Sequence, residues 1–143
     1  MVELKNPATK TDIENAILAW MDLLAEKKYS EAFDFTLHDQ YYQWSPESIE
    51  NIINGYGLPF DNEISEKCLV TKWNFAIHET SRHYKDIDLF DTPREYTDLT
   101  YLVIGDACYD LPIDGKWSDL TATFKILKSD YFTTLELNEI HVL

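Results

Sequence analysis

The sequence predicts one α+β domain spanning residues 1–143, with amino-terminal helices packed on one face of a curved, mainly antiparallel sheet of four or more strands. Apolar residues recur every three to four positions up to Pro59 and every second position after it. This single change of period separates a helical half from a stranded half. The chain has 143 residues, of which 45% are apolar, which is typical of one ordinary domain.

Three helical segments are expected in the first half. Thr11 and Glu14 have the spacing of a capping box, so the first helix should begin at Thr11. A short second helix is predicted over residues 30–37. Ser45 followed by Pro46 combines an N-cap with a proline that is tolerated in the first turn, so a third helix should follow.

The second half begins with a predicted strand over residues 68–78, where apolar and polar residues alternate. Residues 79–97 are rich in charge and lack a clean period, so they are expected to form a long connection. Within it, residues 87–90 are the best candidates for an edge strand or a short helix.

The last three strands are expected to form a meander. Residues 99–113 alternate, and Asp114-Gly115 is typical of a two-residue type I′ hairpin turn. A second two-residue turn is predicted at residues 129–130. In the last strand, the apolar positions change parity, so one extra residue near Asn138-Glu139 is expected to form a β-bulge. The positions that the bulge brings to one face are Leu135, Leu137, Ile140 and Val142.

This register places Asp110, Asp119 and His141 side by side in a row across three strands, on the face away from the apolar side chains. Two carboxylates and an imidazole at such spacing could perform acid/base chemistry or bind a metal weakly, and they are the only candidate catalytic residues. The alternative is structural: polar residues alternate on any exposed sheet face, and Asp119 can bond to neighbouring backbone. No metal site is assigned.

The same face also carries apolar side chains, among them Leu102, Ile104 and Trp117. Such a patch is unusual on a soluble monomer. We expect it to be covered, either by a homodimer interface through the sheet or by the connection at residues 79–97.

Two other sets of aromatic residues suggest binding. A small-ligand pocket between helices and sheet would be lined by Trp20, Tyr56, Trp73, Tyr101 and Phe124. Residues 40–44 join three aromatics to two glutamines, which suits a pocket rim, an interface anchor or a loop that closes over the end of the sheet.

The formal net charge of −14 disfavours nucleic acid as a partner, because the surface would repel phosphates. It favours a basic protein or a small cation. The sequence shows neither a membrane span nor a secretory leader, so we expect a cytoplasmic protein. Common nucleotide, metal and hydrolase motifs are missing, so we expect no cofactor.

Residues 118–121, Ser-Asp-Leu-Thr, followed by the closing residues 139–143, resemble a family of small uncharacterised bacterial domains. Members also show a Tyr-Gly at the end of a helix, as Tyr56-Gly57 does here. The resemblance covers residues 47–57 and 116–143 and implies an architecture without an activity. The order of elements also resembles the NTF2-like (cystatin-like) superfamily, which includes small-ligand enzymes, dimerising binding modules and toxin-immunity proteins.

Together these features favour a bacterial, non-catalytic binding or protein-interaction domain, with neutralisation of a basic toxin as one form that it could take. The alternative is an NTF2-like small-ligand binder or enzyme. The first depends on the negative charge, the aromatic loop and the missing motifs, whereas the second needs a pocket between helices and sheet.

Overall fold

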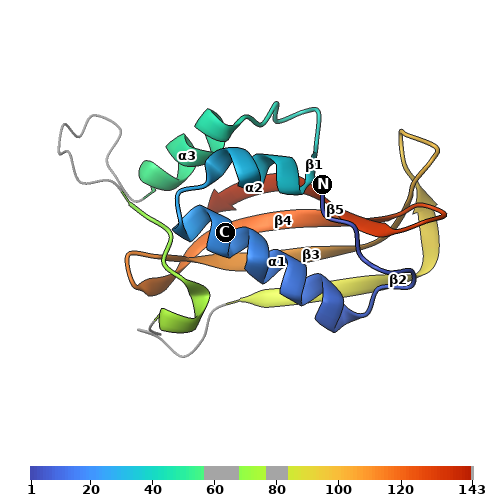
Figure 1. Cartoon of the computed structure of the whole chain (residues 1–143), viewed down its shortest axis with the longest axis horizontal. Coiled ribbons are helices and arrows are strands. Elements are labelled where there is room, and N and C mark those ends of the chain that lie inside the picture. The colour runs from blue at the N-terminus through green and yellow to red at the C-terminus, as the bar shows by residue number, and fades with distance from the viewer. Residues whose placement is uncertain (57–67, 77–83, 143) are drawn as a thin grey trace.

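The computed structural model describes residues 1–56, 68–76 and 84–142. Its sheet contains β1 (Leu37–His38), β2 (Lys85–Glu95), β3 (Leu102–Ile113), β4 (Lys116–Lys128) and β5 (Thr133–Val142), in the order β1-β5-β4-β3-β2. The helices α1 (Lys10–Ala25), α2 (Tyr29–Phe35) and α3 (Pro46–Asn54) all lie on one face of it (Figure 1). The α+β class with helices first is therefore confirmed.

Helix starts follow local capping chemistry. The N-cap of α1 is Thr9, two residues before the expected Thr11, because Thr9 and Asp12 form the capping box. The Asp12 amide donates to Thr9 Oγ1 at 3.1 Å, and the Thr9 amide donates to Asp12 Oδ2 at 2.9 Å. α3 begins as expected after its N-cap Ser45 with Pro46 in the first turn. Ser48 completes that capping box.

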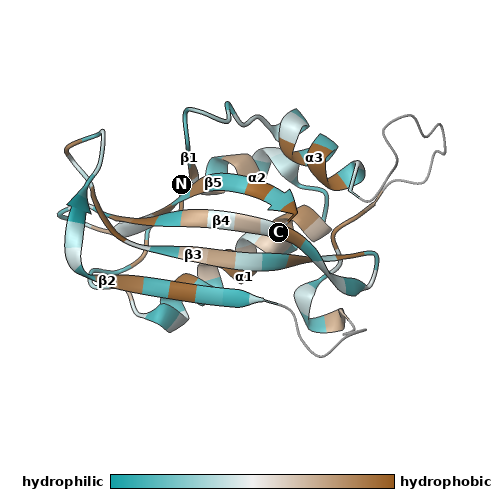
Figure 2. Cartoon of the chain, turned by 180° about the vertical axis from the view of Figure 1, so that it is seen from behind, coloured by the Kyte–Doolittle hydropathy of each residue, from teal (hydrophilic) through white to brown (hydrophobic). Residues whose placement is uncertain are grey.

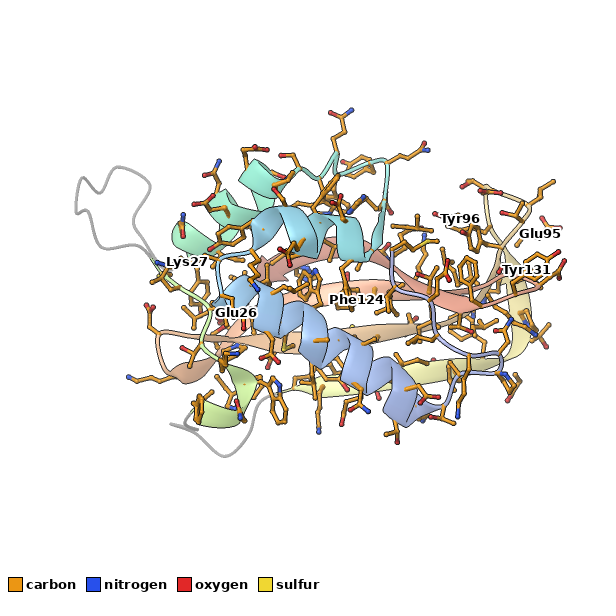
Figure 3. All side chains as sticks on the ribbon, viewed as in Figure 1. Glu26, Lys27, Glu95, Tyr96, Phe124 and Tyr131 are labelled. Carbon is orange, nitrogen blue, oxygen red and sulfur yellow. The ribbon has the colours of Figure 1, made fainter. Side chains whose placement is uncertain are left out.

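The hydrophobic core lies between the helices and the sheet. Trp20 of α1 and Phe124 of β4 are fully buried and pack edge to face, with ring centroids 5.2 Å apart. In Figure 3, Phe124 lies over the sheet, in the space between the ribbons of α1 and α2. The core side chains of the sheet alternate along β3, β4 and β5, so one face of each strand is apolar.

Strands β3, β4 and β5 form the expected antiparallel meander. Asp114 and Gly115 both have positive φ, at 50° and 86°, as a type I′ turn requires. The predicted bulge in β5 is confirmed, because Thr123 pairs with Glu139 while Phe124 pairs with Leu137. β1 adds a short parallel strand at the β5 edge.

The prediction of a strand over residues 68–78 is wrong for the residues of this segment that the structure describes. Val70 makes one isolated bridge to Ile113, and Trp73–Phe75 forms the 3-10 helix η1. Residues 77–78 lie outside the described part of the chain. The edge strand expected around residues 87–90 is instead the eleven-residue strand β2. The alternation of apolar and polar residues therefore did not lead to strand pairing along residues 68–76.

The outer face of the sheet is the face turned away from the helices, and Figure 2 shows that none of the helices covers it. β2 departs from regular pairing there: Leu89 pairs with Gly105 and Arg94 with Val103, so residues 90–93 lie opposite the single residue Ile104. We call residues 90–97 the β2 arm. Tyr96, in this arm, hydrogen-bonds to Glu136 of β5, so the arm reaches across the outer face.

Candidate functional site

The β2 arm and the outer face enclose a pocket of about 410 Å³. That volume lies in the range of small-ligand sites, about 300–1,000 Å³. The pocket extends from the residues after β1 across β5, β4 and β3 to the arm. Its charged lining residues are Asp39, Arg94, Glu95, Asp106, Lys125 and Glu136.

Glu136 forms the floor of this pocket and is only 1% exposed. The Tyr96 hydroxyl donates a hydrogen bond to Glu136 Oε2, and Lys125 Nζ lies 4.0 Å from Oε1. Burial raises the pKa of Glu136, although the hydrogen bond from Tyr96 and the charge of Lys125 both act to lower it. Burial, together with the bond to Glu136, raises the pKa of Tyr96. A buried carboxyl group with a perturbed pKa in a pocket is typical of functional sites.

Like charges face one another at the β2–β3 side of the pocket. Asp106 on β3 pairs directly with Asp88 on β2. Desolvation, then the charges of Asp88 and Asp86, raise the pKa of Asp106, whereas the charge of Arg94 acts to lower it. Carboxylates directly opposite on neighbouring strands are destabilising. Lys125, the partner of Asp106 on β4, offsets part of this negative charge.

The cations in the pocket already have partners. Arg94 lies over the ring of Phe90, with its guanidinium carbon 4.1 Å from the ring centroid. Lys125 is held near Glu136. Carboxylates outnumber cations in the lining, so the net negative charge of the pocket favours a positively charged ligand.

Asn138 contributes a hydrogen-bond acceptor to the pocket. It is the extra residue of the β5 bulge, and its backbone oxygen accepts a hydrogen bond of 2.8 Å from Trp44 Nε1. Asn138 lines the pocket, and its buried side-chain Oδ1 has no hydrogen-bond partner among the described residues. A buried acceptor of this kind is satisfied by a ligand or by water.

The predicted row is not formed as expected. Asp110 pairs with Thr121, and Thr121 pairs with His141, so Thr121 takes the position expected for Asp119. Two local features cause the difference. β4 carries two extra residues opposite Leu111, and the turn after β4 spans residues 129–132 instead of 129–130.

The Ser-Asp-Leu-Thr segment has structural roles in this arrangement. Ser118 Oγ donates to the Leu111 carbonyl at 2.7 Å and accepts from the Leu120 amide at 3.1 Å, which holds the β4 bulge. Exposed Asp119 accepts a hydrogen bond from the Tyr56 hydroxyl at the end of α3. The segment therefore joins β4 to its neighbours.

Asp110 is held by hydrogen bonds within the sheet. It is 7% exposed and accepts hydrogen bonds from the Thr121 hydroxyl at 2.7 Å and from the Tyr84 amide at 2.6 Å. These bonds favour the structural interpretation for Asp110. His141 Nδ1 lies 3.5 Å from a Glu139 carboxylate oxygen and has no hydrogen-bond partner among the described residues. Within residues 1–56, 68–76 and 84–142, the structure contains no group of His, Cys, Asp or Glu side chains suited to a metal ion.

The aromatic pocket expected between helices and sheet is not assembled. Trp20 and Phe124 fill the core, whereas Tyr56 lies at the end of α3 and Trp73 is 36% exposed on η1. Tyr101 packs near Phe132, at the other end of the sheet. The pocket under the β2 arm lies on the opposite face of the sheet.

The three residues proposed for a homodimer interface do not form one patch on the outer face. Ile104 packs against the hydrophobic core, because the irregular pairing at this position turns it inward. Leu102 is 44% exposed, and Trp117 is half-buried. The β2 arm covers the outer face at Glu136 but leaves Leu102 exposed. The homodimer stays a prediction.

Sequence reasoning missed Glu136, Tyr96 and Asn138. Glu136 and Asn138 alternate with core leucines, so their outward direction could be inferred, but they resembled any solvated sheet face. What buries Glu136 is the β2 arm, from a segment expected to be a connection. The aromatic residue Tyr96 in that charged segment was the available signal.

No family model, curated protein or solved structure matches the chain. Among the described residues, no helix combines the length and apolar character needed to cross a membrane. The function must therefore be inferred from the pocket.

Proposed function

We propose that this chain is a non-catalytic binding protein that holds a basic partner protein against the outer face of its sheet, at the pocket under the β2 arm. The observation that supports this proposal is the charge of the pocket: carboxylates exceed cations, and both cations are already paired or stacked. The formal net charge of −14 would also attract a basic partner at long range. An immunity protein that neutralises a basic toxin would have these features.

Peptide display against the full chain tests this proposal, because it requires no knowledge of the natural partner. We expect the enriched peptides to be basic and their binding to weaken as salt rises. A pocket variant, Glu95→Gln with Asp106→Asn, should bind them much less tightly. Both side chains are exposed, so the variant should fold.

The matched control is Glu31→Gln with Glu47→Gln, which removes the same charge from exposed positions on α2 and α3. This control should retain binding. Enrichment of peptides without positive charge, or equal loss of binding in both double variants, would contradict the proposal.

The second candidate is a small-ligand binder or enzyme of the NTF2-like kind. It is favoured by the size of the pocket and by the raised pKa of Glu136, which suits a carboxyl group that gives or takes a proton. Screening by thermal shift, with Glu136→Gln as the control, distinguishes it: an uncharged small molecule that stabilises only the wild type would favour this candidate.

A further inference from the structure

Two acceptor atoms of the pocket receive no hydrogen bond from the part of the chain that the structure describes. Tyr96 satisfies one oxygen of Glu136, but the other lies 4.0 Å from Lys125, which is beyond hydrogen-bonding distance. Asn138 Oδ1 is buried without any donor. Both residues lie on the outer face of β5 and line the same pocket. A ligand group that fits these two acceptors would carry several N–H donors.

The charge of the pocket favours a cation for that group, because carboxylates outnumber cations in its lining. Asp106 lies between Asp88 of β2 and Lys125 of β4, and Glu136 is almost completely removed from solvent. A neutral donor would satisfy Asn138 but would leave the repulsion between the aspartates in place. A cation with N–H donors would satisfy the Asn138 acceptor and would also reduce the repulsion between the aspartates.

An arginine side chain matches this pocket better than a lysine side chain. Guanidinium offers five N–H donors in a plane and can reach acceptors that are separated along a strand, whereas an ammonium group is compact and strongly hydrated. The pocket also has aromatic walls. Its own Arg94 already lies over Phe90, which shows that a guanidinium on an aromatic ring fits this part of the molecule.

We propose, on the basis of the proposed function, that the pocket captures one arginine side chain of the partner protein, with Glu136 and Asn138 as its acceptors. The arginine enters between the β2 arm and strand β5. The remaining carboxylates attract the basic surface around it.

NMR titration of the full chain tests this inference with three blocked amino acids: N-acetyl-arginine, N-acetyl-lysine and N-acetyl-citrulline, each as the methylamide. Citrulline has nearly the shape of arginine but no charge. We expect the arginine probe to shift the side-chain amide of Asn138 and the β5 backbone amides. Citrulline should bind at least about tenfold more weakly, because it lacks the charge-assisted bond, and lysine should bind more weakly than arginine.

Two variants locate the site. Glu136→Gln keeps the shape and an acceptor for Tyr96, and it should weaken the arginine probe by about tenfold or more. If that variant folds poorly, Asp106→Asn changes an exposed residue of the same pocket and should weaken the probe by a smaller factor. Glu31→Gln on α2 is the control and should have no effect.

Equal binding of arginine and citrulline, or lysine binding as tightly as arginine, would overturn the inference. So would an arginine probe that leaves β5 unshifted. These results are separable from a failure of the proposed function. If display peptides depend on the pocket while the arginine probe shows no preference, only the arginine inference is wrong. If the arginine probe behaves as expected while basic peptides ignore the pocket, the proposal of a protein partner is wrong.

Discussion

Replacing Tyr96 by phenylalanine tests whether the β2 arm is held by its bond to the buried Glu136. The change keeps the ring over the sheet and removes only the hydroxyl group that donates to Oε2. A hydrogen bond to a charged group contributes about 1.5–3 kcal/mol, and the loss is largest where the acceptor is buried. We therefore expect the free energy of unfolding at neutral pH to fall by about 2 kcal/mol. In a urea denaturation this lowers the midpoint by roughly 1 M.

The pH dependence gives a second, independent readout. Because burial raises the pKa of Glu136 in the folded state above 4.5, the folded protein binds more protons than the unfolded chain just above that pH. Stability therefore falls as pH rises from the unfolded value through the folded value. The bond from Tyr96 lowers the folded pKa, so Tyr96→Phe should extend this loss to higher pH. Glu136→Gln should abolish it.

Tyr101→Phe is the matched control for this experiment. Tyr101 is a neighbouring half-buried tyrosine whose hydroxyl group contacts only Met1 Sδ, at 3.8 Å, among the contacts of the described residues. Its loss should change the free energy of unfolding by less than about 0.5 kcal/mol. If both tyrosine variants unfold at the same urea concentration and with the same pH dependence, the bond between the arm and the sheet contributes nothing, and the reasoning is refuted.

Three further changes test the fold that supports the pocket, each by urea denaturation. Gly105→Ala should cost about 1–3 kcal/mol, because its methyl group would collide with the backbone oxygen of Asp88; an unchanged midpoint would show that β2 does not lie so close. Ser118→Ala removes both hydrogen bonds that hold the β4 bulge and should cost about 1–2 kcal/mol, so a neutral result would contradict their role. Phe124→Ala should cost about 3–5 kcal/mol through the cavity left beside Trp20, and a loss below 1 kcal/mol would mean that the core collapses to fill it.

The meander was predictable because two sequence features act locally. Asp114-Gly115 determines the hairpin turn, and the change of parity between Leu137 and Ile140 requires an extra residue wherever both side chains are buried. Both predictions are confirmed. Each depends on a few neighbouring residues and on burial, and not on contacts between distant segments.

The register of the polar row could not be predicted for a specific physical reason. The β4 bulge and the longer turn at residues 129–132 each shift the pairing by two residues relative to the expected register. A shift of two leaves every side chain on its original face, so burial does not distinguish Thr121 from Asp119 as the neighbour of Asp110. The hydrogen bonds of Ser118 decide between them, and these are visible only in the structure.

The pocket could not be predicted from the sequence, because the residues that line it are far apart along the chain. Asp39, Tyr96 and Glu136 come from three separated segments and meet only when β2 crosses the outer face. The capping box shows the same kind of ambiguity at short range: both Thr9-Asp12 and Thr11-Glu14 have suitable spacing. Glu14 instead accepts a hydrogen bond of 2.6 Å from Tyr109, a contact with a strand far along the chain.

Strand β2 ends the described sheet, and its outer edge has backbone groups without a partner strand. Exposed aspartates along it, at positions 86, 88 and 91, together with Pro93, discourage another chain from pairing there. This protection is electrostatic, and it weakens as the carboxylates take up protons near the isoelectric point of about 4.4. The net charge of the whole molecule also vanishes there, so a long edge containing Ile87 and Leu89 has the least charge to keep neighbouring molecules apart. Edge-to-edge aggregation is therefore the physical risk of storing this protein near that pH.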